Sequence, residues 1–211
     1  MLEIRPMVAD DLPQIKTLIR TAWADSEEDN QAVVDAETFI YLNPAMHDST
    51  FGRVAVEGTK VVGVVFCTHQ DETPAFRRLQ SDGAQETLSL LRAGQHDLQW
   101  VLNDLRQWEA VYAELTAGRD GRYQARIELL CVDPQWQRRY IATALLGEVM
   151  AYCLKHSTAY LAVLAQTPAE VAFFKEVGFT ACDRSRVATD TLSLPTVYLC
   201  EKAVLPIMHG E

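Results

Sequence analysis

Two adjacent arginines, Arg138 and Arg139, follow a turn at the end of an apolar segment. Residues 126–132 are mostly apolar, Asp133-Pro134 is a turn signal, and small and apolar residues recur at helical spacing after the arginines. The pattern predicts a buried strand, a turn and a helix that begins near Arg138. Because the first N–H groups of a helix lack intrahelical partners and carry partial positive charge, such a turn is suited to a diphosphate.

The composition describes a globular protein with an acidic balance. The chain has 211 residues, 48% of them hydrophobic, which is enough for a full core. Its 19 basic and 29 acidic residues give a formal net charge of -10, which disfavours nucleic acid and anionic membranes as partners and slightly favours cationic substrates such as amines. The N-terminus lacks a secretory signal pattern and no apolar run is long enough to span a membrane, so we expect a cytoplasmic protein.

The cysteines and histidines are dispersed along the chain. The five cysteines are an odd number without CxxC spacing, and the five histidines lack metal-ligand spacing. We therefore expect reduced core thiols and no metal site. A catalytic cysteine would need a polarising neighbour, and it remains a minor alternative because no histidine adjoins a cysteine in the sequence. The cysteines are Cys67, Cys131, Cys153, Cys182 and Cys200.

The first part of the chain predicts a strand, two helices and a hairpin. Asp10 or Asp11 is positioned to cap a helix whose apolar residues follow three- and four-residue spacing. A second helix is expected to end at Asn43-Pro44, because the residue before a proline disfavours helical geometry. The expected ranges are a strand at 2–7, helices at 12–23 and 33–41, and hairpin strands at 53–56 and 60–68.

The stretch from 70 to 122 interrupts the strand pattern. Its leucines, together with Trp100 and Trp108, form a helical stripe broken near Gly94, which predicts a helical insertion. Such a stripe is typical of ordinary core packing. It would also suit a lid or the surface of a homodimer.

Strands and helices alternate after the insertion. The expected ranges are strands at 126–132, 160–164, 179–185 and 196–201, and helices at about 138–155 and 168–177. Hairpins combined with strand-helix-strand crossovers predict an α/β fold with a mixed β-sheet flanked by helices. We expect one domain over residues 1–205, with the insertion at about 70–122 between the third and fourth strands, and a tail at 206–211.

In this order of elements the chain resembles the GNAT superfamily of acyl-CoA-dependent N-acyltransferases, over nearly its whole length once the insertion is set aside. Residues 132–142, Val-Asp-Pro-Gln-Trp-Gln-Arg-Arg-Tyr-Ile-Ala, are similar to the family's Val-x-Pro-x-x-Gln/Arg-x-x-Gly-x-Gly/Ala motif. Residues 170–179, Glu-Val-Ala-Phe-Phe-Lys-Glu-Val-Gly-Phe, resemble its Asn-x-x-Phe-Tyr-x-x-x-Gly-Phe segment. The resemblance implies a GNAT-like α+β sheet that is splayed between its central strands, 127–132 and 160–164.

The resemblance also implies how acetyl-CoA, the co-substrate, is held. Its pantetheine arm would pair with strand 127–132, the N–H of Val132 would lie near the thioester oxygen, and the N–H groups from Arg138 to Thr143 would lie near the pyrophosphate. The implied cofactor-binding residues are Leu130, Cys131, Val132, Gln137, Arg138, Arg139, Tyr140, Ile141, Ala142, Thr143, Thr167, Glu170 and Phe174.

Three of these residues depart from the family pattern. Tyr140 replaces the first glycine of the phosphate loop, so either its ring points away or the diphosphate is displaced. Glu170 replaces an asparagine and brings a negative charge near an anionic ligand unless it turns to solvent. Phe174 replaces the tyrosine often taken as the general acid, which slows rather than abolishes transfer because a thiol of pKa about 8.5 is a tolerable leaving group. Tyr160, Tyr198 or a water could substitute.

The remaining chemical need is a base. An alkylamine of pKa about 10.4 is almost wholly protonated at pH 7, and only its neutral form attacks a thioester. Glu128 is our candidate, because a carboxylate in an apolar strand is unusual. Pairing with Arg126 explains that carboxylate equally well, and Glu57, Asp71 and Glu72 stay open as bases.

Together these residues lead us to expect an N-acetyltransferase in which Glu128 and Val132 serve catalysis. A primary amine of a small molecule or peptide would attack the thioester of acetyl-CoA directly. The alternative is a GNAT-fold protein without transfer chemistry that binds CoA or another protein, which Tyr140, Glu170 and Phe174 together motivate.

Overall fold

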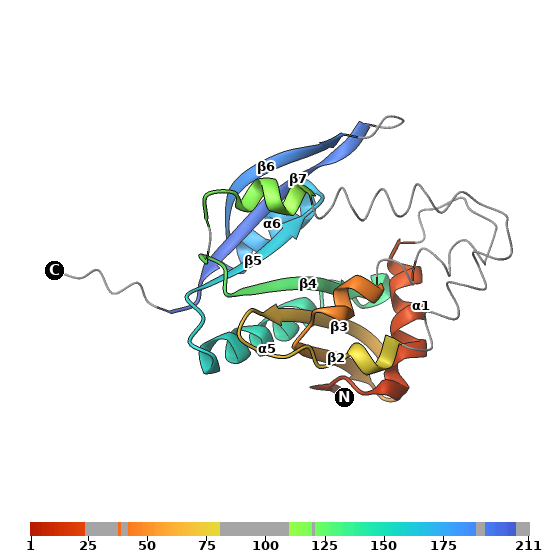
Figure 1. Ribbon diagram of the computed structural model, residues 1–211. Coiled ribbons are helices and arrows are strands. Elements are labelled where there is room, and N and C mark those ends of the chain that lie inside the picture. The colour runs from red at the N-terminus through yellow and green to blue at the C-terminus, as the bar shows by residue number, and fades with distance from the viewer. Residues whose placement is uncertain (24–37, 39–41, 81–109, 120, 189–192, 206–211) are drawn as a thin grey trace, which may run out of the picture. The chain divides into compact units, whose positions relative to one another are not determined.

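The computed structural model describes residues 1–23, 38, 42–80, 110–119, 121–188 and 193–205 (Figure 1). The chain forms two compact units, each assembled from two separate stretches. The first unit comprises Met1–Leu98 and Glu128–Ala151, and the second comprises Gln99–Ile127 and Tyr152–Glu211. The expectation of a single domain over residues 1–205 stays a prediction.

Seven strands among the described residues follow the order β1-β2-β3-β4-β5-β7-β6. The pair β4 (Ala125–Val132) and β5 (Tyr160–Ala165) is parallel, and helix α5 (Ile141–Lys155) lies between them in the chain as a crossover. The pairs β1–β2, β2–β3, β5–β7 and β6–β7 are antiparallel. The predicted mixed α/β fold is confirmed.

The first unit packs helix α1 against three antiparallel strands. The elements are β1 (Leu2–Pro6), α1 (Leu12–Trp23), β2 (Phe51–Glu57) and β3 (Lys60–His69). β3 is buried continuously from Val61 to Cys67, as expected of an apolar strand covered on both faces. The core includes Ile15 and Ile19 of α1 and Phe66 of β3. The predicted hairpin is present, with Gly58 at a φ of 63° in its turn.

Two details of the first unit differ from the expected elements. A 3₁₀ turn, η1 (Ala9–Asp11), precedes α1, and the carboxylate of Asp11 accepts the N–H of Val8 at 2.9 Å. Residues 42–47 are helical, so the helix end predicted at Asn43-Pro44 is wrong. Pro44 itself lies within this helical segment, so the proline does not end the helix here. The helix predicted at 33–41 lies outside the described residues, apart from helical residue 38.

The second unit packs helix α6 and helical residues 110–116 with the C-terminal strands. The strands are β5, β6 (Thr180–Ala188) and β7 (Ser193–Ala203), and α6 is Pro168–Glu176. Val111 and Leu115 lie in one buried cluster with Ala162, Val197 and Leu199. Residues 110–116 are therefore helical and apolar on one side, as the stripe predicted. The rest of that stripe, with Trp100 and Trp108, lies outside the described residues.

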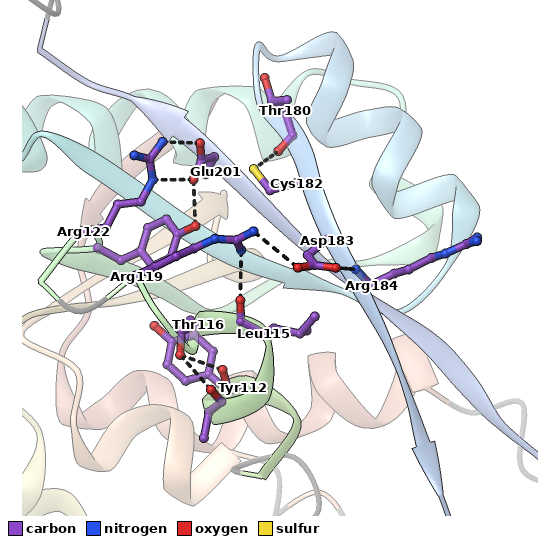
Figure 2. Close-up of polar contacts among 12 residues, drawn as sticks. Tyr112, Leu115, Thr116, Arg119, Arg122, Thr180, Cys182, Asp183, Arg184 and Glu201 are labelled. Carbon is purple, nitrogen blue, oxygen red and sulfur yellow. Dashed lines mark hydrogen bonds and ion pairs between the residues drawn. The ribbon is translucent and has the colours of Figure 1, made fainter.

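Charged residues attach the segment after residue 116 to β6 and β7 (Figure 2). Arg122 donates to both carboxylate oxygens of Glu201 at 2.9 and 2.6 Å, and the hydroxyl of Tyr123 donates to Glu201 at 2.7 Å. Arg119 pairs with Asp183 at 3.3 Å. The hydrogen bonds from Arg122 lower the pKa of Glu201 to about 2, against the opposing effect of burial. This segment is held by charge as well as by apolar packing.

The cysteines have the properties of core thiols. All five are free; Cys182 is half-buried and the others are buried. Burial raises the pKa of Cys131 to about 12 and that of Cys182 to about 11. Such thiols are poor nucleophiles near neutral pH. No helix in the described part of the chain combines the length and apolar character that crossing a membrane requires.

Candidate active site

Asp133 fixes the point where β4 ends. Its N–H donates to the carbonyl of Val62 at 3.0 Å, and one carboxylate oxygen accepts the N–H of Gln135 at 2.9 Å, capping the 3₁₀ turn η3 (Pro134–Trp136). The other oxygen accepts a hydrogen bond from Nζ of Lys60 at 2.7 Å. Burial raises the pKa of Asp133, but the bonds from Lys60 and Gln135 outweigh it and hold that pKa below its ordinary value. A buried carboxylate therefore anchors the turn.

Two residues between η3 and α5 adopt the left-handed backbone conformation. The φ angle is 61° at Arg138 and 60° at Tyr140. This region costs a residue with a Cβ about 1–2 kcal/mol. Tyr140 stands at the position of a glycine in the GNAT motif and keeps a backbone that suits glycine. The residue is 82% exposed, so its ring points into solvent.

Helix α5 begins at Ile141, so the predicted start near Arg138 is wrong by three residues. The reason is local, because a residue with φ near +60° cannot continue a right-handed helix. The N–H of Ala144 donates to the carbonyl of Tyr140 at 2.9 Å. Within the described residues we find no protein acceptor for the N–H groups from Gln137 to Thr143. A run of main-chain donors is thus available at the helix start.

The side chains around these donors add positive charge. Gln137, Arg138 and Arg139 are exposed, and the Arg139 guanidinium stacks over the Trp136 ring at 4.5 Å. Neither arginine forms an ion pair with any residue that the structure describes. The first turn of α5, which includes Ala142 and Thr143, contains no acidic residue. The turn therefore presents donors and cations, and the first turn of α5 adds no carboxylate to them.

The end of β4 alternates strictly between buried and half-buried residues. Leu129 and Cys131 face the core, whereas Glu128, Leu130 and Val132 share the half-buried face. Glu128 and Val132 therefore lie on the same face of the strand. The recorded β4–β5 pairing joins Ala125–Ile127 to residues 161–163. The roles of Glu128 and Val132, and a slot for a pantetheine arm beyond that pairing, stay predictions.

Glu170 has a structural role at the start of α6. Thr167 caps the helix by accepting the N–H of Glu170 at 3.1 Å, and the Glu170 carboxylate accepts the N–H of Gln166 at 2.7 Å. The two bonds form a variant of the capping box, in which the glutamate accepts from the residue before the N-cap threonine. Glu170 is exposed and serves the helix end.

Phe174 lies in an aromatic cluster of the second unit. It is 5% exposed and packs edge-to-face on Phe173 and Phe179, with ring centroids 5.3 and 5.2 Å away. Its ring carries no proton for a leaving group. Of the two tyrosines proposed as substitutes, Tyr160 is half-buried beneath the Arg122 guanidinium at 3.8 Å, and Tyr198 is half-buried on β7.

The structure brings part of the predicted set together. Glu128–Val132 and Gln137–Thr143 lie in one continuous stretch of the first unit, whereas Thr167, Glu170 and Phe174 belong to the second. Membership of all three in one site stays a prediction. Among the alternative bases, Glu57 pairs with the N-terminal amine of Met1 at 2.9 Å, and Asp71 and Glu72 are exposed.

Sequence reasoning missed Lys60 and the role of Asp133. Asp133-Pro134 carries a signal, because an aspartate before a proline is a typical helix-start pattern. Lys60 lies 73 positions earlier in the chain, and no local pattern connects it with Asp133.

Comparison with known proteins finds a matching domain and matching folds. Residues 106–195 match the sequence profile of the acetyltransferase (GNAT) domain. Solved structures with the same fold span nearly all of the chain and are themselves nearly fully covered. They include the ribosomal-protein-S18-alanine N-acetyltransferase of Escherichia coli, with 14% identity over 100% of this chain and 97% of that one, at a TM-score of 0.59. Residues 106–195 thus match a GNAT acetyltransferase domain, and the chain has the fold of these N-acetyltransferases.

Two further GNAT structures are similar. PaiA N-acetyltransferase from Thermoplasma acidophilum, solved in complex with coenzyme A, has 15% identity over 96% of this chain and 99% of that one, at a TM-score of 0.55. The polyamine N-acetyltransferase of Drosophila melanogaster has 13% identity over 96% of this chain and 100% of that one, at a TM-score of 0.58. No curated protein sequence matches this chain. At these identities the structures establish the fold, and the GNAT assignment supports acyl-CoA-dependent N-acetyltransfer in general terms.

Proposed function

We propose that this GNAT protein is an acetyl-CoA-dependent N-acetyltransferase whose acceptor is a primary amine of a small molecule or peptide. The observation that carries the proposal is the left-handed backbone at Arg138 and Tyr140. Residues with a Cβ hold such a conformation at a cost, and backbone strain of this kind concentrates at functional sites. Here it occurs at the loop position where the GNAT motif places a glycine.

The residues of this turn fit a diphosphate. The N–H groups from Gln137 to Thr143 have no protein acceptor among the described residues, and the Tyr140 ring points into solvent instead of covering them. Arg138 and Arg139 add two charges that suit phosphate oxygens. A pyrophosphate at this turn would meet main-chain donors and cations, which is the chemistry that anions find at helix starts.

The proposed transfer step requires a base and a donor for the carbonyl oxygen. Glu128, directly or through a water, would accept a proton from the ammonium form of the acceptor. The neutral nitrogen then attacks the thioester carbon, and the C–N bond forms as the C–S bond breaks. The N–H of Val132 would stabilise the negative charge that develops on the carbonyl oxygen. The nitrogen loses its second proton as it becomes an amide, and this proton reaches the departing thiolate through water, because Phe174 has none to give.

The acceptor is proposed to be cationic. The formal charge of -10 favours attraction of ammonium groups over anions. The Drosophila relative, which has the same fold, forms N-acetylagmatine. A cytoplasmic location and a homodimer stay predictions.

A second candidate function is a CoA-binding or protein-interaction module without transfer chemistry. The buried position of Phe174 between Phe173 and Phe179 favours it, because an aromatic packing residue occupies the place of the usual general acid.

Calorimetric titration of acetyl-CoA and CoA into the protein tests the binding claim. Heat of binding in the micromolar range supports it, and the double variant Arg138→Gln/Arg139→Gln should bind more weakly. Arg184→Gln, at an exposed arginine of β6, is the matched control and should bind like the wild type. Absence of heat at high micromolar ligand would contradict the transferase and the CoA-binding module, and would leave only a protein-interaction module.

Thiol release from acetyl-CoA, measured with a panel of primary amines that includes polyamines, separates the two candidates. Amine-dependent release supports the transferase. Binding of CoA without release on any amine supports the module and contradicts the transferase.

A further inference from the structure

The turn that carries the left-handed residues is attached to β3 at its first end. Asp133 uses all of its polar groups there. Its N–H donates to Val62, its carbonyl accepts the N–H of Trp136 at 2.7 Å, and its two carboxylate oxygens accept from Gln135 and Lys60. The side chain of Asp133 is 6% exposed, so this carboxylate depends on protein donors rather than on water.

Lys60 is the cationic partner in that arrangement. It is the first residue of β3, directly after the turn that contains Gly58, and its side chain is 55% exposed. Nζ lies 2.7 Å from Oδ2 of Asp133. The ammonium therefore reaches from solvent to a buried oxygen, and its removal would leave a buried acceptor without its donor.

The second end of the turn also rests on β3. A Cβ added at Gly63 would lie 3.0 Å from Cγ2 of Ile141 and 3.1 Å from Cδ1 of Leu145, so the first turn of α5 packs directly on the backbone of this glycine. Ile141 and Leu145 are both buried. One strand thus fixes the chain on both sides of the residues from Pro134 to Tyr140.

We propose that Lys60 and Asp133 form a positioning pair for the anion-binding turn, an inference that rests on the function proposed above. Neither residue needs to contact the ligand. The pair fixes the direction in which the chain leaves β4. The packing of Ile141 and Leu145 on Gly63 holds the first turn of α5 in place. The main-chain donors between them then hold their orientation before a diphosphate arrives, which lowers the cost of ordering the turn on binding.

A double-mutant cycle tests this pair, with CoA as the probe. Calorimetry gives the dissociation constant for the wild type, Lys60→Met, Asp133→Asn and the double variant. Asparagine is chosen because it also serves well as a helix cap. We expect Lys60→Met to weaken CoA binding about tenfold in the wild-type background, the size of a lost charged hydrogen bond, and less than about twofold in the Asp133→Asn background.

Two control variants accompany the cycle. Lys60→Arg keeps a cationic donor and should bind CoA within about twofold of the wild type. Lys155→Met removes a lysine from the far end of α5, where Lys155 is exposed, and should leave the dissociation constant unchanged. Thermal unfolding without ligand shows that each variant is folded at the titration temperature.

Each outcome decides the proposal. A loss of CoA affinity on Lys60→Met that occurs only where Asp133 is present supports the proposal. An equal loss in both backgrounds overturns it, because Lys60 would then act on the ligand directly. Equal binding by the wild type and Lys60→Met overturns it while leaving the proposed function intact. A wild type that binds no CoA overturns both.

Discussion

At the scale of single residues, Tyr140 carries the largest departure from the family pattern. The GNAT motif has a glycine at this position, and the tyrosine retains a φ of 60° with its ring in solvent. The backbone conformation has thus been kept without the residue that adopts it most easily.

Comparison of Tyr140→Gly with Tyr140→Ala measures this strain. Both variants remove an exposed ring, so they differ mainly in backbone freedom. Relief of the left-handed cost of about 1–2 kcal/mol, less the extra entropy of a glycine in the unfolded chain, should leave the glycine variant more stable by about 0.5–1 kcal/mol in urea unfolding.

The same comparison at Ala151, an exposed residue within α5, should have the opposite sign. There glycine should be less stable than the native alanine by about 1 kcal/mol, because the position is helical. An alanine variant at 140 more stable than the glycine variant would contradict a left-handed Tyr140.

Residue types revealed part of the candidate site in advance. The position of the turn and its arginines followed from an apolar strand, a proline and helical spacing. The left-handed φ angles of Arg138 and Tyr140 could not be predicted from the residue types, because arginine and tyrosine rarely adopt them. Only the glycine of the family motif indicates such an angle. The role of Glu170 was encoded as Thr-x-x-Glu, a capping pattern, although the family comparison suggested a place near the cofactor.

At the scale of elements, the contact between β3 and α5 holds the first turn of the helix against the strand. Gly63→Ala should destabilise the protein by about 1–2 kcal/mol, because the added methyl group meets Ile141 and Leu145 at 3.0 and 3.1 Å in a packed core. Urea unfolding measures the change.

Gly147→Ala is the matched control for that substitution. Gly147 is exposed within α5, and a Cβ there would have nothing within 4 Å. Alanine should stabilise the helix by about 0.5–1 kcal/mol. Equal effects at both positions would contradict the packing of α5 on Gly63.

The ion pair between Arg122 and Glu201 gives the second unit a defined acid response. The pKa of Glu201 falls from 4.5 to about 2, first because of the hydrogen bonds from Arg122. A carboxyl group with a depressed pKa contributes stability that is complete above its unfolded value and disappears as the pH falls through its folded value. The contribution of Glu201 is therefore lost between about pH 4.5 and 2.

Glu201→Gln should unfold at a lower temperature than the wild type near pH 7, and the two unfolding temperatures should converge as the pH approaches 2. Thermal unfolding across that range, followed by circular dichroism, measures the gap. Glu176→Gln, an exposed glutamate on α6, is the control and should follow the wild type. A constant gap down to pH 2 would contradict the account of this pair.

At the scale of the whole molecule, the order of strands and helices was predictable because each buried element repeats apolar residues at its own period. The sequences of β3 and β5 are apolar runs, and that of α1 has apolar residues at three- and four-residue spacing. Two predicted helix boundaries were wrong. The helix continues through Pro44, and the left-handed backbone at Tyr140 places the start of α5 after that residue. The contact between Lys60 and Asp133 was beyond sequence reasoning, because only the folded chain brings two such distant positions together.

The charge of the molecule and the charge of the turn have opposite signs. The whole chain carries -10, whereas Arg138 and Arg139 stand without ion-pair partners in the described part of the chain. Recognition of an anionic co-substrate must therefore be local, and we propose that it depends on the donors between Gln137 and Thr143.

A titration of ¹⁵N-labelled protein with CoA, followed by amide chemical shifts, tests that dependence most directly. The account predicts that the largest shift changes fall on the amides from Arg138 to Thr143, with a further change at Val132. Saturable binding that leaves these amides unchanged would contradict it.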